Sequence, residues 1–337
     1  MIRAIALSVL VSFVSMLAHA DGPAKWVTYE GREGPGHGKH IVFVTGDDEY
    51  RSEESMPQLA KILAVRHGFK CTVLFAINKD TGAIDPATLD NIPGLEQLDT
   101  ADLMILFLRF RELPDDQMTH IMDYTNSGKP IMALRTSTHP FFYKDIKSSP
   151  YSKWNWTSPD PKGGYGREVL GETWVNHYGN HKVQSTRGIV APGMEKNPIV
   201  QGCEDIWGPS DVYEVTTLSG DGAPLILGQV LTGMNPTDKP ADGKKELPIA
   251  WTKTYTGTSG KPSRVFTTTM GHSFDLHSEG FRRLLVNAAY WSIGIEDQIP
   301  ARADVAIVGE YTPIDIGFGT HRVGIMPESH VLGAEAP

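Results

Sequence analysis

A histidine, a group of acidic residues and an arginine each follow a short apolar run of the chain, where they could transfer protons or hold a substrate. His272 follows the run Arg264–Met270 through Gly271. Its imidazole could act as a general base or bind a metal ion, because histidine titrates close to neutral pH. Alternatively, His272 could cap the following turn by hydrogen bonding. We predict a catalytic acid or base at this position.

Three acidic residues, Asp47, Asp48 and Glu49, follow the apolar run His40–Gly46. Carboxylates at such a place suit sugar hydroxyls or a divalent cation, and a raised pKa would let one of them act as a general acid or base. We predict a catalytic role for Asp48 and substrate contacts for Asp47 and Tyr50. The simpler alternative is an acidic, solvated turn.

A polar turn follows Leu134 and contains Arg135, Thr136, Ser137 and His139. We predict that the planar guanidinium of Arg135 holds a carboxylate, an enolate or a sugar oxygen. Its structural alternative is an ion pair with one of the acids at 47–49. The other three side chains are predicted to contact the substrate. Ser137 could also be a hydrolytic nucleophile beside a histidine, but the glycines of the Gly-x-Ser-x-Gly turn are absent.

The stretch Tyr143–Gly193 is rich in aromatic, Asn, Gly and His residues and has little periodicity, so we predict long loops that carry binding residues. Its aromatic rings offer flat faces for pyranose rings, or alternatively anchor the loops inside the protein. These rings belong to Trp154, Trp156, Tyr165, Trp174 and Tyr178. We predict substrate contacts for Trp174, and for Tyr213 further along the chain.

His177 and His181 in the same stretch have the i, i+4 spacing of two metal ligands on a helix. Gly179 and Asn180 lie between them and disfavour a helix. A loop could still bring His177, His272 and an acid together around a divalent metal such as zinc, although the familiar short zinc motifs are absent. The need for a cofactor stays open, and His177 is otherwise predicted to contact the substrate.

The elements that must position these residues follow an alternating pattern in the first half of the chain. Apolar runs typical of buried parallel strands occur at His40–Gly46, Cys71–Ile77, Asp102–Leu108 and Pro130–Leu134. Helical patterns lie between them, at 55–68 and 115–128. Strands alternating with helices predict an α/β three-layer sandwich with a mostly parallel central sheet. Ligands bind beyond the carboxyl ends of such strands, where the candidate residues lie.

Three further strands and one helix are predicted in the second half. The strands are Ala223–Val230, Leu247–Lys253 and Arg264–Met270. From Glu279 to Gly294, apolar residues recur every three or four positions, and the glycine can end the helix. Residues 295–337 hold several Pro and Gly and few apolar runs, which predicts an extended tail lying on the domain.

The first 20 residues predict export. Arg3 precedes an apolar run at 4–17, and Ala18-His19-Ala20 supplies the small-x-small ending of a secretory signal peptide that is cleaved before Asp21. The apolar run is short for a helix that spans a bilayer. We therefore expect a secreted or periplasmic protein that is not inserted in the membrane after cleavage.

Charge and composition narrow the range of partners. Removing the predicted signal peptide takes away one of 31 basic residues and none of 40 acidic ones, which leaves a net charge of −10. Nucleic acid and anionic membranes are therefore poor partners, whereas a homo-oligomer is compatible with the sequence. The two cysteines, Cys71 and Cys203, are too few for a disulfide scaffold or a cysteine zinc cluster. They could form one disulfide or remain free thiols.

Several segments of the chain carry a family resemblance. They are Thr45–Tyr50, Pro130–His139, Val169–His177, Asn197–Gly202, Arg264–Ser273 and the helical stretch Phe281–Trp291. With the acid and tyrosine at Asp211 and Tyr213, they resemble the trehalose-utilisation (ThuA-like) family over roughly residues 39–294. The segment around Gly271 and His272 is the most specific part of this resemblance.

The resemblance implies the flavodoxin-like fold of class I glutamine amidotransferases and a role in the use of disaccharides, including oxidised sugars. Family members often have Gly-Leu-His where this chain has Ala133-Leu134-Arg135. Neither cysteine falls at the turn where the amidotransferases keep their nucleophile, so we do not expect glutaminase activity. The expected layout is a signal peptide at 1–20, an N-terminal extension at 21–38, a ThuA-like α/β domain at 39–294 and a tail at 295–337.

We predict a secreted enzyme of carbohydrate breakdown, a hydrolase or lyase that acts on a glycoside or keto sugar by acid/base chemistry. His272, Asp48 and Arg135 form its predicted catalytic centre. A non-catalytic sugar-binding or scaffolding protein is one alternative, and a serine hydrolase centred on Ser137 is another. In each case the expected partner is a small molecule, and for the first two it is a carbohydrate.

Overall fold

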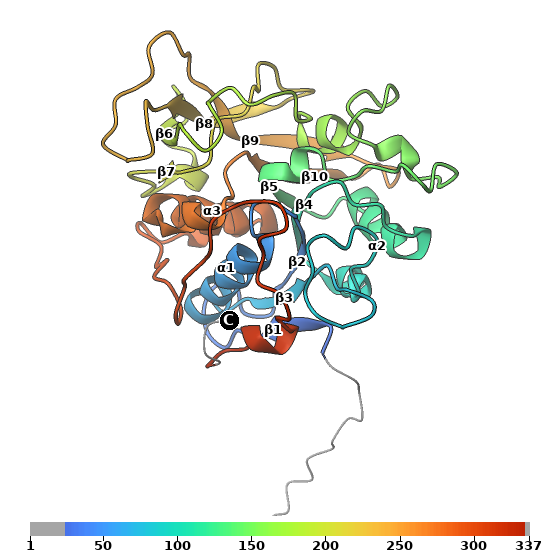
Figure 1. Ribbon diagram of the computed structural model, residues 1–337. Coiled ribbons are helices and arrows are strands. Elements are labelled where there is room, and N and C mark those ends of the chain that lie inside the picture. The colour runs from blue at the N-terminus through green and yellow to red at the C-terminus, as the bar shows by residue number, and fades with distance from the viewer. Residues whose placement is uncertain (1–23, 334–337) are drawn as a thin grey trace, which may run out of the picture.

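One large mixed sheet with helices against both faces organises the molecule (Figure 1). The computed structural model describes residues 24–333, so the predicted signal peptide lies outside the described residues. Its three α-helices are α1 (Ser52–His67), α2 (Asp115–Asn126) and α3 (Glu279–Ile293). Its strands are β1 (Trp26–Tyr29), β2 (His40–Gly46), β3 (Lys70–Leu74), β4 (Leu103–Leu108), β5 (Ile131–Leu134), β6 (Thr186–Val190), β7 (Trp207–Gly208), β8 (Ala223–Val230), β9 (Leu247–Thr256) and β10 (Pro262–Thr268).

Five neighbouring strands, in the order β3-β2-β4-β5-β10, run parallel to one another. Every residue of β2 and β4 is buried, because helices cover both faces of this part of the sheet. Ile41 and Phe43 face the core shared with α1 and α3, whereas Val42 and Val44 face the core shared with α2. Figure 1 shows α1 and α3 to one side of these strands and α2 to the other. The predicted α/β fold and its three layers are therefore present.

The prediction of a mostly parallel sheet is wrong. Four strand pairings are parallel. Five are antiparallel: β1 pairs with β3, and the order β10-β9-β8-β6-β7 continues the sheet beyond the parallel strands. No helix connects β8 to β9 or β9 to β10, and antiparallel neighbours need no crossover helix. Strand β1 lies within the stretch that was predicted to be an N-terminal extension.

Local sequence signals fix the ends of the helices. Ser278 precedes α3, and its hydroxyl accepts a hydrogen bond from the backbone N–H of Phe281. Gly294 follows α3 with a φ of 82°, and Gly68 follows α1 with a φ of 79°, a left-handed conformation that glycine adopts without steric cost. These helices cover one face of the parallel strands.

The C-terminal tail, described over residues 295–333, crosses the carboxyl-end edge of the sheet next to α1 (Figure 1). The backbone N–H of Gly317 donates to the carbonyl of Glu49 over 3.0 Å. The guanidinium of Arg51 donates to the carbonyls of Asp315 and Gly317 over 3.1 and 2.7 Å. The tail is thus fixed to the edge that carries the candidate residues.

Two properties of the described chain bear on the earlier expectations. Cys71 is buried in β3, Cys203 is partly buried, and both are free thiols. Among residues 24–333, no helix combines the length and the apolar character needed to cross a membrane.

Candidate functional site

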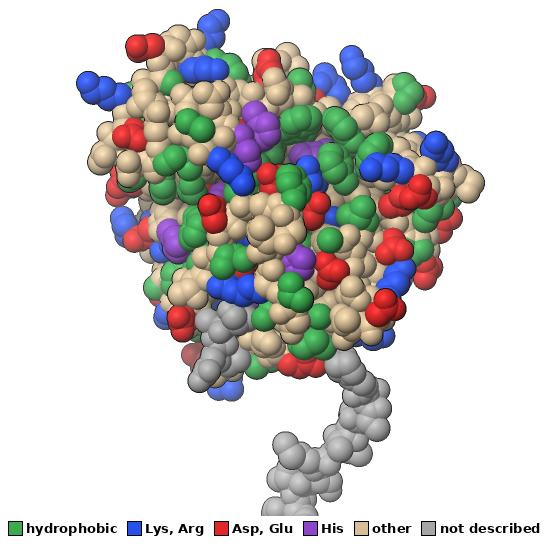
Figure 2. All heavy atoms as spheres, in the orientation of Figure 1, with side chains coloured by type: hydrophobic (Ala, Val, Ile, Leu, Met, Phe, Trp, Pro, Cys, Tyr) green, Lys and Arg blue, Asp and Glu red, His purple; other side chains and the backbone are tan. Residues whose placement is uncertain are grey.

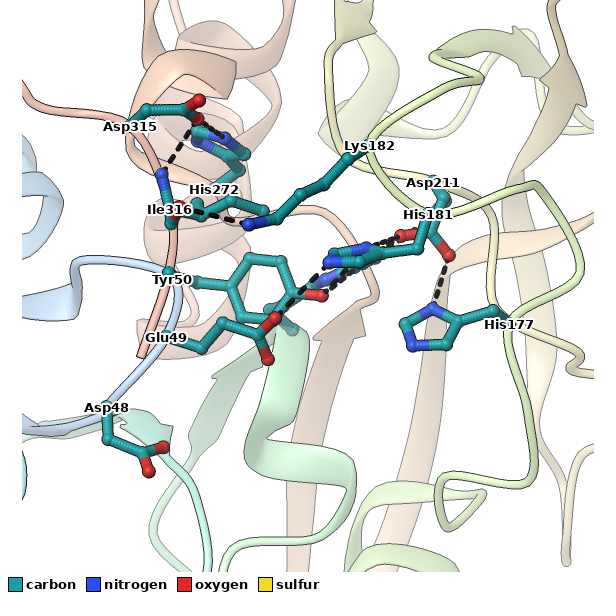
Figure 3. A network of polar contacts seen from close by, with 12 residues as sticks. Asp48, Glu49, Tyr50, His177, His181, Lys182, Asp211, His272, Asp315 and Ile316 are labelled. Atoms are coloured by element: carbon teal, nitrogen blue, oxygen red, sulfur yellow. Dashed lines mark hydrogen bonds and ion pairs between the residues drawn. The ribbon is translucent and has the colours of Figure 1, made fainter. Parts of the chain in front are cut away.

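Polar residues that follow strands β2 and β10 meet residues of two loops and of the C-terminal tail at the carboxyl-end edge of the sheet (Figure 3). Asp48, Glu49 and Tyr50 follow β2, and His272 follows β10. His177 and Asp211 come from loops that flank β6 and β7. Residues far apart in the sequence therefore share one network of polar contacts.

Arg135 begins the turn after β5 in an unusual conformation. Its φ is 46°, in the left-handed region that few residues other than glycine adopt. A Cβ atom at position 271 would lie 3.1 Å from the Cβ of Arg135, so Gly271 leaves room for this turn. The turn after β5 is therefore sharp, and it begins with an arginine.

The guanidinium of Arg135 is fully buried, and its partners come from several parts of the chain. It donates to the carboxylate of Asp211 over 2.7 Å, to the hydroxyl of Tyr50 over 3.0 Å and to the carbonyl of Thr269 over 2.8 Å. Its central carbon lies 3.8 Å from the ring centroid of Tyr213 and 4.5 Å from that of Tyr50. The structural alternative, a partner among residues 47–49, is therefore replaced by a pairing with Asp211.

Asp211 is a buried carboxylate that holds two histidines (Figure 3). Its Oδ2 lies 2.7 Å from Nδ1 of His177, and its Oδ1 lies 2.9 Å from Nδ1 of His181. Burial alone raises the pKa of Asp211, but the charge of Arg135 and the bonds from both histidines hold it well below its usual range. Asp211 is therefore an anion at neutral pH.

His181 lies between two carboxylates. Besides Asp211, its Nε2 lies 3.2 Å from Oε1 of Glu49, an ion-pair contact. Asp211 and Glu49 raise the pKa of His181 to about 9 against the opposing effect of burial. The side chains of His177 and His181 keep 34% and 25% of their surface exposed, so solvent reaches the cluster.

A row of aromatic rings leads away from this cluster. The ring centroids of His177 and Trp174 are 5.7 Å apart, those of Trp174 and Trp156 are 5.9 Å apart, and those of Trp156 and Phe110 are 5.6 Å apart. His139 packs behind Trp174 and is buried, which lowers its pKa well below the usual value. Figure 2 shows histidine and hydrophobic side chains next to one another on this face of the molecule. We call Phe110, Trp156 and Trp174 the aromatic wall.

An ion pair lies next to the aromatic wall, at the ends of β2 and β4. Arg109 donates to Asp48 over 2.8 Å, and its guanidinium lies over the ring of Phe110 and under that of Phe318 from the tail. Asp48 is partly exposed, as a substrate contact requires. Asp47, in contrast, is fully buried and accepts bonds from the backbone of Glu49 and from Thr136, so it shapes the turn.

His272 lies beneath the tail. Its Nδ1 accepts a hydrogen bond from the backbone N–H of Phe274 over 3.0 Å, and its Nε2 lies 3.4 Å from Oδ1 of Asp315. Burial, opposed by Asp315, lowers the pKa of His272 to about 3. This position matches the alternative in which His272 caps the following turn. A catalytic role for His272 stays a prediction, but a neutral, covered imidazole is poorly placed for it.

The turn after β5 buries its hydroxyl groups. Ser137 has no exposed surface, donates to the carbonyl of Leu106 over 2.9 Å and accepts from the backbone N–H of Leu108 over 3.1 Å. A nucleophile must reach the substrate, so this geometry gives the serine-hydrolase alternative no support. Thr136 is likewise buried and bonded to Asp47.

The family comparison adds to this geometry. The model of the ThuA family, described as trehalose utilisation, matches residues 40–292 of the chain. The chain belongs to the ThuA family. The resemblance seen in the sequence is therefore confirmed. The family description suggests a carbohydrate-related role, and kinship with the fold of the glutamine amidotransferases stays a prediction.

Solved structures include two ThuA-like proteins that are similar to this ThuA chain. The one from Parabacteroides merdae is 15% identical, with a TM-score of 0.48, and the match covers 76% of this chain and 90% of that one. The one from Bacteroides uniformis is 15% identical, with a TM-score of 0.43, and the match covers 77% and 93%. No curated protein sequence matches the chain.

Four residues of this ThuA site were not among the predicted site residues: Glu49, Arg109, His181 and Asp211. Each had a signal in the sequence. Arg109 directly follows a predicted strand, and His181 has the i, i+4 spacing with His177. Asp211 appeared only as part of the family resemblance, because nothing local shows that it pairs with Arg135.

Proposed function

We propose that this ThuA protein is an exported carbohydrate-processing enzyme that acts on a glycoside or an oxidised sugar. Its proton-transfer centre is the cluster of His177, His181 and Asp211 rather than His272. The observation that carries the proposal is the pairing of a partly exposed imidazole, His177, with the buried carboxylate of Asp211 at one end of the aromatic wall. An enzyme needs such a titratable group within reach of its substrate.

The arrangement suits binding of a sugar ring next to the cluster. Aromatic rings pack against the C–H faces of pyranoses, and Trp156 and Trp174 are both partly exposed. In Figure 3, Asp48 and His177 lie on opposite sides of the network, so a ligand placed between them has a carboxylate on one side and an imidazole on the other. Oxygen and nitrogen partners on both sides would fix the orientation of its hydroxyl groups.

A keto sugar gives this cluster a defined task. A carbonyl at C3 makes the proton on C2 acidic, so a base at the cluster can remove it. The electron pair left on C2 forms a double bond to C1 as the glycosidic C1–O bond breaks, and the leaving oxygen takes up a proton. Addition of water to that double bond completes hydrolysis. General acid/base catalysis of such steps contributes roughly 10² to 10⁴-fold.

Turnover by the mature chain tests the proposal. Disaccharides and their 3-keto derivatives are incubated with residues 21–337, with and without divalent metal, and the products are measured. We expect turnover that is lost in His177→Ala. His120→Ala is the matched control, since His120 also pairs with an aspartate but lies on α2, away from the site. Binding without turnover, with equal affinity in wild type and His177→Ala, would support the sugar-binding alternative instead.

A further inference from the structure

We infer that His177, His181 and Asp211 bind one divalent transition-metal ion of the zinc class. Two imidazoles and one carboxylate form a ligand set that zinc prefers. One ligating atom from each of the three side chains lies within 4.8 Å of the other two. The set does not include His272, whose nitrogens face the N–H of Phe274 and the carboxylate of Asp315.

The distances leave room for an ion after a small adjustment. Nitrogen and oxygen ligands lie about 2.0–2.2 Å from zinc, which separates neighbouring tetrahedral ligands by roughly 3.3 Å. The nitrogens of His177 and His181 now lie 2.7 and 2.9 Å from the oxygens of Asp211, so each would move away from the carboxylate by a few tenths of an ångström. The ligand atoms of the two histidines lie within 4.8 Å of one another and would take up the same tetrahedral separation. Both histidines belong to the loop before β6, whose backbone is bonded to Val212 through Tyr178 and Gly179, so the movement falls on the side-chain torsions.

The surrounding residues hold the ligands in orientations that suit a metal. Ligating histidines usually direct their second ring nitrogen to a carboxylate or carbonyl. His181 directs Nδ1 to Asp211, and its Nε2 lies 3.2 Å from Glu49. Arg135 holds Oδ1 of Asp211 over 2.7 Å, which fixes this carboxylate and leaves Oδ2 facing His177.

The charges around the cluster also accommodate a dication. Asp211 and Glu49 supply two negative charges, and the buried Arg135 supplies one positive charge. A divalent ion with neutral histidines would leave one excess positive charge, which a metal-bound hydroxide cancels. Three protein ligands with an open fourth position are typical of catalytic zinc rather than structural zinc. In the proposed function, the metal-bound water would be the base that removes the proton from the sugar. Only this catalytic consequence rests on the proposed function, whereas metal binding does not.

Metal binding by the purified mature chain tests the inference. The protein is stripped with a chelator and dialysed against zinc, and its metal content is measured by atomic emission; Co²⁺ replaces zinc for a visible spectrum. We expect about one equivalent of zinc per chain and the intense absorption of tetrahedral Co²⁺. His177→Ala and His181→Ala should each lose stoichiometric metal, and Glu49→Gln should bind roughly 10- to 100-fold more weakly.

Two controls separate metal binding from folding and from turnover. His120→Ala should bind as wild type does, and circular dichroism should show that all variants are folded. Lack of stoichiometric metal in the wild type, or unchanged metal in the double variant His177→Ala/His181→Ala, overturns the inference. Because no sugar is present, a chain that binds zinc without sugar turnover supports the inference while contradicting the proposed function. Turnover by the chelator-stripped chain would support the proposed function and contradict only the role of a metal-bound water as its base.

Discussion

Two histidine-bearing regions lie along the same edge of the sheet, but the chain treats them differently. His272 is covered by the C-terminal tail, with 3% of its side chain exposed, and both of its ring nitrogens face groups of the protein. His177 keeps 34% of its side chain exposed, and only one of its ring nitrogens is bonded to the protein, to the carboxylate of Asp211. The first arrangement closes a turn, whereas the second leaves a titratable group next to an aromatic wall.

The difference shows that a place at a strand end does not by itself expose a side chain to solvent. Both histidines lie beyond the carboxyl ends of the parallel strands, where ligands usually bind in such sheets. What separates them is the tail, whose residues Asp315–Gly317 lie over His272 and not over His177. Access to solvent therefore distinguishes the two histidines.

Paired substitutions give the largest expected effect. His177→Ala should lower kcat/KM for the active sugar on the order of 10³-fold, which corresponds to about 4 kcal/mol. His272→Asn keeps an acceptor for the backbone N–H of Phe274, so it should change kcat/KM by less than about threefold. Steady-state kinetics of both variants provide the measurement. Equal losses in both would place the catalytic centre beneath the tail and reverse the comparison.

Breaking the buried ion pair between Arg135 and Asp211 should give the second-largest effect, a loss of stability. Arg135→Met leaves the carboxylate of Asp211 buried without its cation, so the free energy of unfolding should fall by roughly 3 kcal/mol or more. Arg109→Met is the matched control, because Arg109 pairs with a partly exposed Asp48 and should cost about 1 kcal/mol or less. Urea unfolding measures both. Similar losses would mean that burial of the Arg135–Asp211 pair does not stabilise this region.

The sequence predicted the parallel part of the sheet because every signal there is local. The apolar run at 40–46 coincides with β2, and the glycines at 68 and 294 end the helices as expected. The strands β1, β6 and β7 were missed because they lack the continuous buried apolar run that marks β2 and β4, and their pairing depends on strands elsewhere in the chain. Long-range pairing is also why the mostly parallel arrangement was wrong.

The sequence predicted only those residues of the candidate site that have a local signal. Asp48 and His177 follow from residue type and position, and both lie in the open part of the network. The partner of Arg135 is 76 residues away in the sequence, and the cover over His272 comes from residue 315, so neither has a local pattern. Burial of His272 by a distant segment is therefore a feature that its local sequence could not indicate.

The stability of the protein should depend on pH because the C-terminal tail contains a buried histidine. His330 of the tail is buried against Phe75, and burial, with Lys61 and Arg322 nearby, lowers its pKa to about 4. The unfolded chain binds this proton near pH 6.5, so stability is fully present above 6.5 and falls by about 3 kcal/mol as the pH drops toward 4. Chemical unfolding of wild type and His330→Gln at pH 7 and pH 4.5 measures this effect. The variant should lose less stability than wild type on acidification; an equal loss would show that other groups control it.

The smallest effect should come from the one aromatic residue through which the tail reaches the open region. Phe318 is 57% exposed, and its ring lies 4.7 Å from the guanidinium of Arg109, which in turn holds Asp48. An exposed cation–π contact contributes about 0.5–1 kcal/mol, so Phe318→Ala should raise KM two- to fivefold with kcat unchanged, as expected for an interaction made equally with substrate and transition state. Val323→Ala, at an 85% exposed tail position, should leave both constants unchanged. If Phe318→Ala also leaves KM unchanged, the tail acts only as a cover for His272, and the two histidine-bearing regions are functionally separate. If KM rises, the tail covers His272 and also helps to bind the substrate beside His177.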